Sequence, residues 1–382
     1  MEYDLVFEGG GAKGIVFVGA MQEFEARGHT VGRIMGTSAG AITATLLAAG
    51  YSAKQMLEVI NERLPGPEKK PRFSTFMDVP PRFDQDHVDN SLIYLLFSGI
   101  DIPLIADSLE AQIDAKIMKK LLEYPSFRQL FSFVERGGLY SGDLFLFWFR
   151  EKLNAGGRVL GNTTLKQFHE QTGKDLTVMA SDTSGQELLV LNHRTAPNLP
   201  TAWAVRMSMS IPFVWQEVIW LKEWGLYRGR DITGHWIVDG GALSNFPIDH
   251  FLDDTLEIRE VMGPDKGSGN VVGFLIDDTI PVPNLPAKPG TEKAKTELDK
   301  RWFIVLDRVN NLINTITQAH DKSTMLAYKN NVCHLPAKGV GTVEFDMTND
   351  RINTLMAGGL NAAREYFNGL NRLARPRPSS GR

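Results

Sequence analysis

The stretch Gly36-Thr37-Ser38-Ala39-Gly40 joins a short apolar run at residues 31–35 to an alanine- and leucine-rich segment at 39–49. This order predicts a buried strand, a sharp turn and a buried helix. A glycine on each side of Ser38 lets the strained turn form and lets a substrate approach the hydroxyl closely. Free N–H groups and the dipole at the helix N-terminus would favour an ionised serine. The stretch predicts a serine nucleophile on a βα unit, with a chance turn as the alternative.

A glycine-rich loop follows the first predicted strand at residues 3–7 and precedes a predicted helix at 15–27. The loop reads Gly9-Gly10-Gly11-Ala12-Lys13-Gly14. Its backbone N–H groups would point into a concave space and hold an anion, such as the oxyanion of acyl transfer. The same letters satisfy the G-x-G-x-x-G pattern of dinucleotide sites, but the second strand ends without the acidic residue that holds a ribose. A P-loop is excluded because Gly14, and not Ser or Thr, follows Lys13.

A third motif lies far downstream at residues 236–241, where an apolar run ends in Asp239-Gly240-Gly241. The run predicts a buried strand that delivers Asp239 at its end, and the glycines allow another backbone or a substrate to come close. Alone, this motif is also typical of an ordinary turn.

Together, in this order and with a long gap between Ser38 and Asp239, the three motifs resemble those of the patatin-like phospholipases. That family carries a glycine-rich oxyanion loop, a G-x-S-x-G serine and an aspartate in D-G-[GA]. Residues 138–153, 175–182 and 204–214 resemble bacterial members, among which are delivered effectors that attack host membranes, so the resemblance covers most of the chain. It implies that Ser38 is the nucleophile, that Asp239 is its partner, and that Gly10, Gly11 and the nearby backbone form the oxyanion hole. Lys13 stands where the family often has Arg, and its role is left open.

The resemblance also places the segment around residues 210–212 near the acyl pocket. Apolar side chains of this segment would form a wall there, with plain core packing as the alternative. They are Met207, Met209, Ile211, Pro212 and Phe213.

The implied fold is a three-layer α/β fold with a mostly parallel central sheet, helices on both faces and a helical cap insertion. Apolar and helical segments alternate through about residue 65, and strand-like runs return at 176–180, 188–191, 235–238 and 271–276, as βα units predict. We expect a catalytic domain at 1–280 with a cap insertion at 66–136, for which plain helical packing is the alternative to a moving lid. A proline-rich linker or loop at 281–297, a C-terminal helical part at 298–372 packed on the core, and a disordered tail at 373–382 complete the chain.

Composition narrows the class of protein. The chain has 382 residues, is 43% hydrophobic and carries a net charge of −4, which argues for a sizeable core and against nucleic acid as the main partner. No apolar run reaches the length of a membrane span, and the N-terminus lacks the basic start of a signal peptide. The single cysteine, Cys333, excludes an intrachain disulfide. We expect a cytoplasmic protein with peripheral membrane contact, with delivery by a non-classical secretion route as the alternative.

Neither a metal nor a cofactor is expected. The acidic cluster at residues 84–89 lacks the glycine and the distal glutamate of a calcium loop. Asp277 and Asp278 end a predicted strand, where capping is the commoner role. None of the eight histidines has a triad-like context; His235, four residues before Asp239 on an extended strand, is about 13 Å away.

The expected function is that of a serine acyl hydrolase. It would cleave fatty-acyl esters of phospholipids or lysophospholipids through a Ser38–Asp239 dyad and an acyl-enzyme. The expected partner is a lipid substrate at a membrane or micelle surface, and the need for a protein activator is left open. A hydrolase of small soluble esters and a non-catalytic lipid-binding module are the alternatives.

Overall fold

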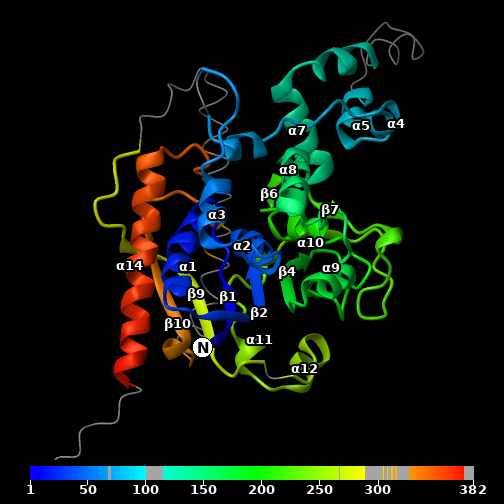
Figure 1. The fold of residues 1–382 in the computed structure, drawn as a ribbon. Coiled ribbons are helices and arrows are strands. Elements are labelled where there is room, and N and C mark those ends of the chain that lie inside the picture. Colours follow the sequence, from blue (N-terminus) through cyan, green and yellow to red (C-terminus); the bar gives the residue numbers. More distant parts are fainter. Residues whose placement is uncertain are drawn as a thin grey trace, which may run out of the picture.

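A computed structural model describes residues 1–67, 70–99, 115–265, 267–288 and 327–373, together with residues 304, 308, 311, 312 and 315. A central sheet runs through the middle of the molecule (Figure 1). Its strands are β1 (Glu2–Phe7), β2 (Thr30–Thr37), β4 (Leu176–Asp182), β5 (Glu187–Leu191), β7 (Val218–Ile219), β8 (Trp236–Asp239), β9 (Val271–Pro281) and β10 (Val332–Lys338). The order is β10-β9-β1-β2-β4-β8-β7, and β5 pairs with β4 beside this path.

The sheet is parallel from β10 to β4 and antiparallel beyond it. β10, β9, β1, β2 and β4 pair in parallel. β5 and β8 run antiparallel to β4, and β7 runs antiparallel to β8. Two further strands, β3 (Gly138–Tyr140) and β6 (Phe213–Trp215), form a small parallel sheet of their own.

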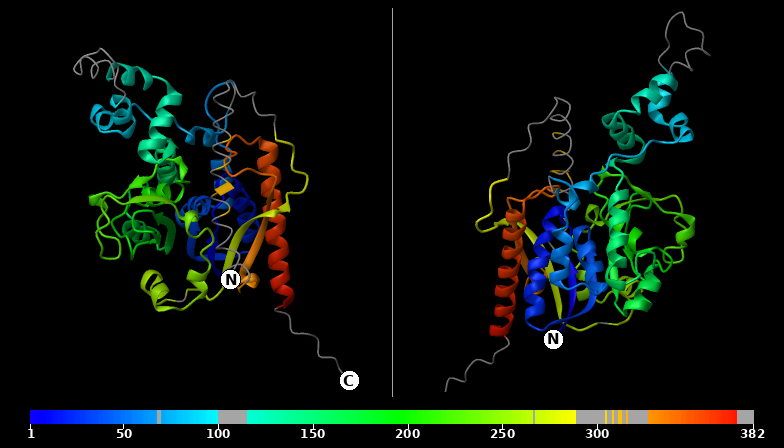
Figure 2. Two further views of the ribbon diagram at one scale, coloured as in Figure 1. Left: turned by 180° about the vertical axis from the view of Figure 1, so that it is seen from behind. Right: turned by 45° about the horizontal axis from the view of Figure 1, so that its top comes forward.

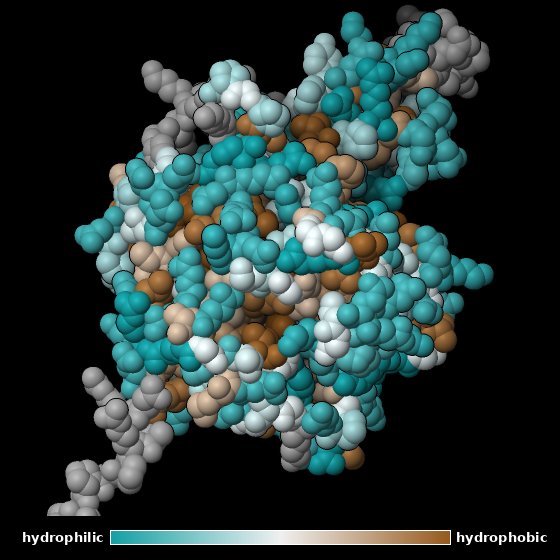
Figure 3. All heavy atoms as spheres, viewed as in Figure 1, coloured by the Kyte–Doolittle hydropathy of each residue, from teal (hydrophilic) through white to brown (hydrophobic). Residues whose placement is uncertain are grey.

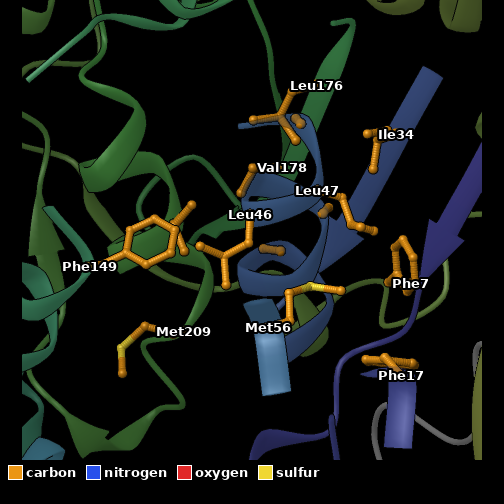
Figure 4. Close-up of a cluster of buried hydrophobic side chains, with 14 of the residues drawn as sticks. Phe7, Phe17, Ile34, Leu46, Leu47, Met56, Phe149, Leu176, Val178 and Met209 are labelled. Atoms are coloured by element: carbon orange, nitrogen blue, oxygen red, sulfur yellow. The ribbon is translucent and has the colours of Figure 1, made fainter. Parts of the chain in front are cut away.

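Alternate strand residues pack into two hydrophobic clusters, one on each face of the sheet. In β1, Leu5 and Phe7 belong to the larger cluster and Val6 to the smaller one, as the two-residue period of a strand requires. Figure 4 shows part of the larger cluster, with Leu46 and Leu47 beside strand residues such as Ile34. The sheet is therefore covered by helices on both faces, as a three-layer α/β fold.

Among the described residues, seven α-helices contribute side chains to the larger cluster. These are α1 (Val16–Ala26), α2 (Ala39–Ala48), α3 (Ala53–Ile60), α8 (Asp143–Asn154), α9 (Leu165–Thr172), α10 (Thr201–Ser208) and α14 (Asn349–Leu373). The smaller cluster receives side chains from α11 (Asp249–Leu252) and α12 (Leu256–Met262). α2 is buried along nearly its whole length, because its alanines and leucines leave it apolar on all sides.

A helical segment projects from this body (Figures 1 and 2). It contains α4 (Gln85–Asp89), α5 (Leu92–Ser98), α7 (Pro125–Arg136) and helical residues at 115–121. The segment has a small core of its own, made of Val88, Met118, Leu122 and Phe131. Asp78, ahead of the segment, accepts hydrogen bonds from the N–H groups of Gly142 (2.8 Å) and Asp143 (3.1 Å). This carboxylate caps the start of α8 and fixes the base of the segment to the body.

The four strands predicted after residue 170 are confirmed as β4, β5, β8 and β9. The helical assignment of residues 298–372 is wrong in one part, because residues 332–338 form β10 in the main sheet. Residues 349–373 form a single helix, α14, which agrees with the helical prediction for the last part of this range. The predicted tail beyond it and most of the predicted linker lie outside the described residues. None of the described helices has the length and apolar character that crossing a membrane requires.

Candidate active site

Ser38 lies between β2 and α2 with φ of 54° and ψ of −121°. Positive φ is uncommon for residues other than glycine, and holding such a residue costs roughly 1–3 kcal/mol. The flanking glycines make the turn possible. A Cβ on Gly36 would lie 2.2 Å from the Gly40 carbonyl oxygen. A Cβ on Gly40 would lie 2.2 Å from the Phe7 carbonyl oxygen. The end of β1, the turn and the start of α2 therefore pack backbone against backbone, which requires glycine at both positions.

The two residues next to Ser38 are also enclosed. Thr37 is fully buried, and its hydroxyl donates a hydrogen bond to the Ser244 carbonyl at 3.4 Å. Ala39 is buried and packs against Gly14. A Cβ added to Gly14 would lie 2.6 Å from the Ala39 Cβ. The turn is thus held on both sides by the loops that follow β1 and β8.

Asp239 ends β8 and is 4% exposed. Its Oδ1 accepts a hydrogen bond from the Gly241 N–H at 2.8 Å. Burial raises the pKa of the Asp239 carboxyl to about 7, although hydrogen bonds from the Ser38 side chain and the Gly241 backbone lower it. Gly240 packs on β4, where an added Cβ would lie 2.6 Å from the Met179 carbonyl oxygen. Serine hydroxyl and carboxylate therefore meet, although Ser38 and Asp239 are about 200 residues apart in the sequence.

The end of α10 holds both residues in place. The Ser208 hydroxyl accepts a hydrogen bond from the Ser38 N–H at 2.8 Å, and the Ser210 carbonyl accepts one from the Asp239 N–H at 2.9 Å. Arg206, which is buried, donates to the Ser210 hydroxyl and to the Ser141 carbonyl. Burial lowers the pKa of Arg206 to about 10, and Asp143 and Asp78 raise it. Ser208 and Arg206 are not among the predicted site residues, and the Ser-Met-Ser pattern at 208–210 is the signal in the sequence that marks Ser208.

The glycine-rich loop runs beside Ser38 and leads into a short 3₁₀ helix, η1 (Gly11–Ile15). A Cβ on Gly9 would lie 3.1 Å from the Ser38 Cβ. Several N–H groups of the loop bind within the protein: that of Gly9 donates to Asn245 (3.1 Å), that of Ala12 to Thr342 (2.8 Å) and that of Lys13 to Gly10 (3.2 Å).

In the described part of the chain, the N–H groups of Gly10 and Gly11 have no protein acceptor. That Gly9 to Gly14 form an oxyanion hole stays a prediction, and the N–H groups of Gly10 and Gly11 are available for such a role. Gly14 has a packing role against Ala39.

Lys13 is tethered at the edge of the loop. Its ammonium lies 2.6 Å from a carboxylate oxygen of Asp278, and its side chain is 8% exposed. This ion pair attaches the loop to β9, in which Asp278 lies three residues before the last residue, and gives the Asp278 carboxylate a structural partner. The neighbouring carboxylate of Asp277 accepts hydrogen bonds from Thr279 and lies 2.9 Å from Nδ1 of His334.

A cavity of about 100 Å³ opens at Ser38. It is lined almost entirely by apolar residues, which come from η1, α1, α2, α3, the segment at 71–76, α8, the segment at 209–215 and the segment at 344–352. The lining residues are Gly11, Ala12, Gly14, Ile15, Val18, Ser38, Ala39, Ile42, Thr43, Leu46, Met56, Val59, Ile60, Pro71, Phe73, Phe76, Phe145, Trp148, Met209, Ile211, Trp215, Glu344, Phe345, Met347 and Ile352. Figure 3 shows hydrophobic residues on the body below the projecting helical segment.

Two of the five predicted pocket residues, Met209 and Ile211, line this cavity. The cavity lining does not include Met207, Pro212 or Phe213. Met207 is fully buried in α10, and Phe213, with φ of 68°, is 40% exposed and packs on Phe133. For Met207 the apolar side chain therefore belongs to the buried core.

The histidines near the sheet have other partners. His235 Nδ1 lies 2.7 Å from a carboxylate oxygen of Asp182. His250 pairs with Asp249, and His193 stacks on His169 with ring centroids 3.8 Å apart. None of these contacts reaches Ser38 or Asp239.

Among the residues that the structure describes, no group of His, Cys, Asp and Glu side chains is arranged to hold a metal ion. Asp84 caps α4 by accepting a hydrogen bond from the His87 N–H at 2.8 Å. The acidic cluster at 84–89 thus has a local structural role.

The family model for patatin-like phospholipases matches residues 5–252. The uncharacterized protein YqhO of Bacillus subtilis (strain 168) is 28% identical over 359 residues, which cover 92% of this chain and 93% of YqhO. The uncharacterized protein R571 of Acanthamoeba polyphaga mimivirus is 26% identical over 254 residues, covering 66% of this chain and 62% of R571.

Among solved structures, VipD from Legionella pneumophila is similar with a TM-score of 0.44 and 17% identity, over 96% of this chain and 67% of VipD. The type III effector ExoU is similar with a TM-score of 0.38 and 17% identity, over 96% of this chain. This chain covers 53% of the length of ExoU.

Proposed function

The chain belongs to the patatin-like phospholipase family, and from this premise we propose that it is a lipid acyl hydrolase with Ser38 as nucleophile and Asp239 as general base. The observation that carries the proposal is the contact of the Asp239 carboxyl, whose pKa is raised to about 7, with Ser38, which lines an apolar cavity. Its proposed substrates are the fatty-acyl esters of phospholipids or lysophospholipids.

Asp239 is suited to accept a proton near neutral pH. A carboxylate with the usual pKa of about 4 is a weak base toward a hydroxyl. Burial brings the pKa of Asp239 to about 7, which lies close to the optimum for a general base at neutral pH. An acyl chain that fills the cavity would exclude water and raise this basicity further.

In the proposed first step, Asp239 takes the proton from the Ser38 hydroxyl while Oγ attacks the ester carbonyl carbon. The carbonyl oxygen becomes an oxyanion, and the N–H groups of Gly10 and Gly11 are the proposed donors that stabilise it. Loss of one such donor typically costs about 3 kcal/mol of transition-state stabilisation. When the intermediate collapses, the C–O bond to the leaving alcohol breaks, and the alcohol takes the proton from Asp239.

The second step returns the enzyme to its starting state. Asp239 takes a proton from water, the hydroxide oxygen attacks the acyl carbon, and a second tetrahedral intermediate forms. Its collapse breaks the bond to Ser38, whose oxygen recovers the proton from Asp239, and the fatty acid leaves. No metal or cofactor takes part in this scheme.

The cavity favours an acyl chain over a small polar ester. Its wall is apolar apart from Ser38, Thr43 and Glu344, and the Glu344 carboxylate is paired with Arg351. Each methylene buried there would contribute roughly 0.8 kcal/mol to binding. A hydrolase of small soluble esters would gain nothing from this wall.

The test uses the full chain with phosphatidylcholine vesicles, mixed micelles and a matched monomeric short-chain ester, and measures released fatty acid. We expect turnover of the lipid that falls by roughly 10³-fold or more in Ser38→Ala and Asp239→Asn. Ser98→Ala, which changes an exposed serine in α5, is the matched control and should keep wild-type activity.

Turnover of the monomeric ester with none of the lipid would favour the small-ester hydrolase. Lipid hydrolysis that persists in Ser38→Ala would refute the assignment of the nucleophile.

A further inference from the structure

One part of the cavity wall comes from beyond the region that the family model matches. That region ends at residue 252, whereas Phe345, Met347 and Ile352 line the cavity together with Ser38. They lie on the connection between β10 and α14 and on the first turn of α14. We call residues 339–348 the wall loop.

A buried ion pair fixes the wall loop to α14. Arg351 Nε lies 2.8 Å from Glu344 Oε1, and the two side chains are 2% and 3% exposed. Arg351 Nη2 donates to Glu344 Oε2 at 3.2 Å and to the Gly339 carbonyl at 2.9 Å, and Glu344 Oε2 also accepts from the Gly341 N–H at 3.0 Å. A bidentate pair whose remaining groups are also bonded holds a single geometry.

The wall loop also contacts the glycine-rich loop. The Thr342 carbonyl accepts a hydrogen bond from the Ala12 N–H at 2.8 Å. A Cβ on Gly11, where φ is +55°, would lie 2.2 Å from the same carbonyl oxygen. The wall loop therefore supports the backbone whose N–H groups are the proposed oxyanion donors.

Phe345 is the side chain of the wall loop that we expect to determine the size of the cavity. It is partly buried and packs edge-on against Trp215, with ring centroids 5.7 Å apart. Trp215 itself lines the cavity and is held by a hydrogen bond from its indole N–H to the Phe76 carbonyl at 2.7 Å. Replacing Phe345 with a smaller residue would therefore enlarge the cavity next to Trp215, which is held in place.

We propose that the wall loop, through Phe345, sets the length of acyl chain that the site accepts. The proposal rests on the proposed function, because it assigns the cavity to the acyl group of the ester attacked by Ser38. It adds a specificity determinant that lies outside the matched family region and names long-chain acyl esters as the class of substrate.

The test measures kcat/KM for p-nitrophenyl esters of increasing acyl length with the wild type, Phe345→Ala and Asp346→Ala. Asp346 is the exposed neighbour of Phe345 and does not line the cavity, so its variant is the matched control. For the wild type and the control, kcat/KM should rise about fourfold per methylene until the cavity is full and then level off. In Phe345→Ala the rise in kcat/KM should continue to longer acyl chains than in the wild type.

A Phe345→Ala profile that levels off at the wild-type length, or that falls by one factor at every length, would overturn the proposal. If Phe345→Ala does not fold, Phe345→Leu should give a smaller shift in the same direction.

Ser38→Ala, measured on the same esters, reports on the proposed function separately. If the wild type shows no turnover that depends on Ser38, displacement of a fluorescent fatty acid by fatty acids of increasing length gives the same comparison at equilibrium. Identical length dependence for Phe345→Ala and the wild type would then refute the proposal.

Discussion

Replacing Asp239 by Asn should stabilise the protein above neutral pH while it removes hydrolysis. Burial raises the pKa of the Asp239 carboxyl to about 7 in the folded state, whereas an aspartate in an unfolded chain has a pKa of about 3.9. Between these values the unfolded chain has released its proton and the folded protein has kept it. The folded state therefore loses stability as pH rises from about 4 to about 7.

The size of this loss follows from the two pKa values. They lie about three units apart, and each unit corresponds to about 1.4 kcal/mol. The raised pKa of Asp239 then lowers the unfolding free energy of the wild type by about 4 kcal/mol at pH 8 but by only about 1.5 kcal/mol at pH 5, as orders of magnitude. Asn has no such cost, so the difference in unfolding free energy between Asp239→Asn and the wild type should grow by roughly 2–3 kcal/mol from pH 5 to pH 8.

Urea unfolding followed by tryptophan fluorescence at several pH values between 5 and 8 measures this difference. Asp231→Asn is the control, because hydrogen bonds from Thr233 lower the pKa of the exposed Asp231 carboxyl, which therefore stays ionised throughout this range. The difference in unfolding free energy between Asp231→Asn and the wild type should not change with pH. A difference for Asp239→Asn that is equally flat would show that the carboxyl is not destabilised by burial, and the argument for a general base with a raised pKa would fail.

Three further outcomes are expected. His235→Gln should keep most of the wild-type activity, since His235 pairs with Asp182; a loss as large as that of the nucleophile variant, in a folded protein, would replace the dyad with a triad. Gly40→Ala should cost about 3 kcal/mol or more in thermal or urea unfolding, because its Cβ would lie 2.2 Å from the Phe7 carbonyl oxygen. By contrast, Gly369→Ala, with nothing within 4 Å of the added Cβ, should be neutral or stabilising by up to about 1 kcal/mol. Excess EDTA should leave the rate of ester hydrolysis unchanged, since no step of the serine mechanism needs a Lewis acid; inactivation that calcium reverses would contradict this.

The sequence predicts the local parts of the site well, because local backbone demands leave local signals. Glycines at 36 and 40 are needed where three backbone segments meet, and they mark the turn around Ser38 without knowledge of the fold. Asp239 is found in the same way, at the end of an apolar run that forms β8.

What the sequence could not predict depends on long-range contacts. Nothing in the glycine-rich loop indicates that the N–H groups of Gly9 and Ala12 bind to Asn245 and Thr342. Met207 and Met209 look alike in sequence, but they lie two residues apart at the end of α10, so only Met209 reaches the cavity.

The strand β10 was missed for a physical reason. Pro336 lies within it, and proline argues against a strand because it has no N–H to donate. Among the described strands, β10 lies at one edge of the sheet, and a missing N–H donor is tolerated on the unpaired side of an edge strand. The wall loop that follows β10 was missed with it.

The central claim is that Ser38 carries the acyl group, and trapping that adduct tests it most directly. The full chain would be incubated with a long-chain alkyl fluorophosphonate, and the labelled residue would be located by peptide mass spectrometry in the wild type, Ser38→Ala and Ser98→Ala. The account predicts one adduct, on Ser38, in the wild type and Ser98→Ala, and none in Ser38→Ala. A folded wild-type protein that hydrolyses the ester substrate but is labelled on another residue, or is not labelled at all, would contradict it.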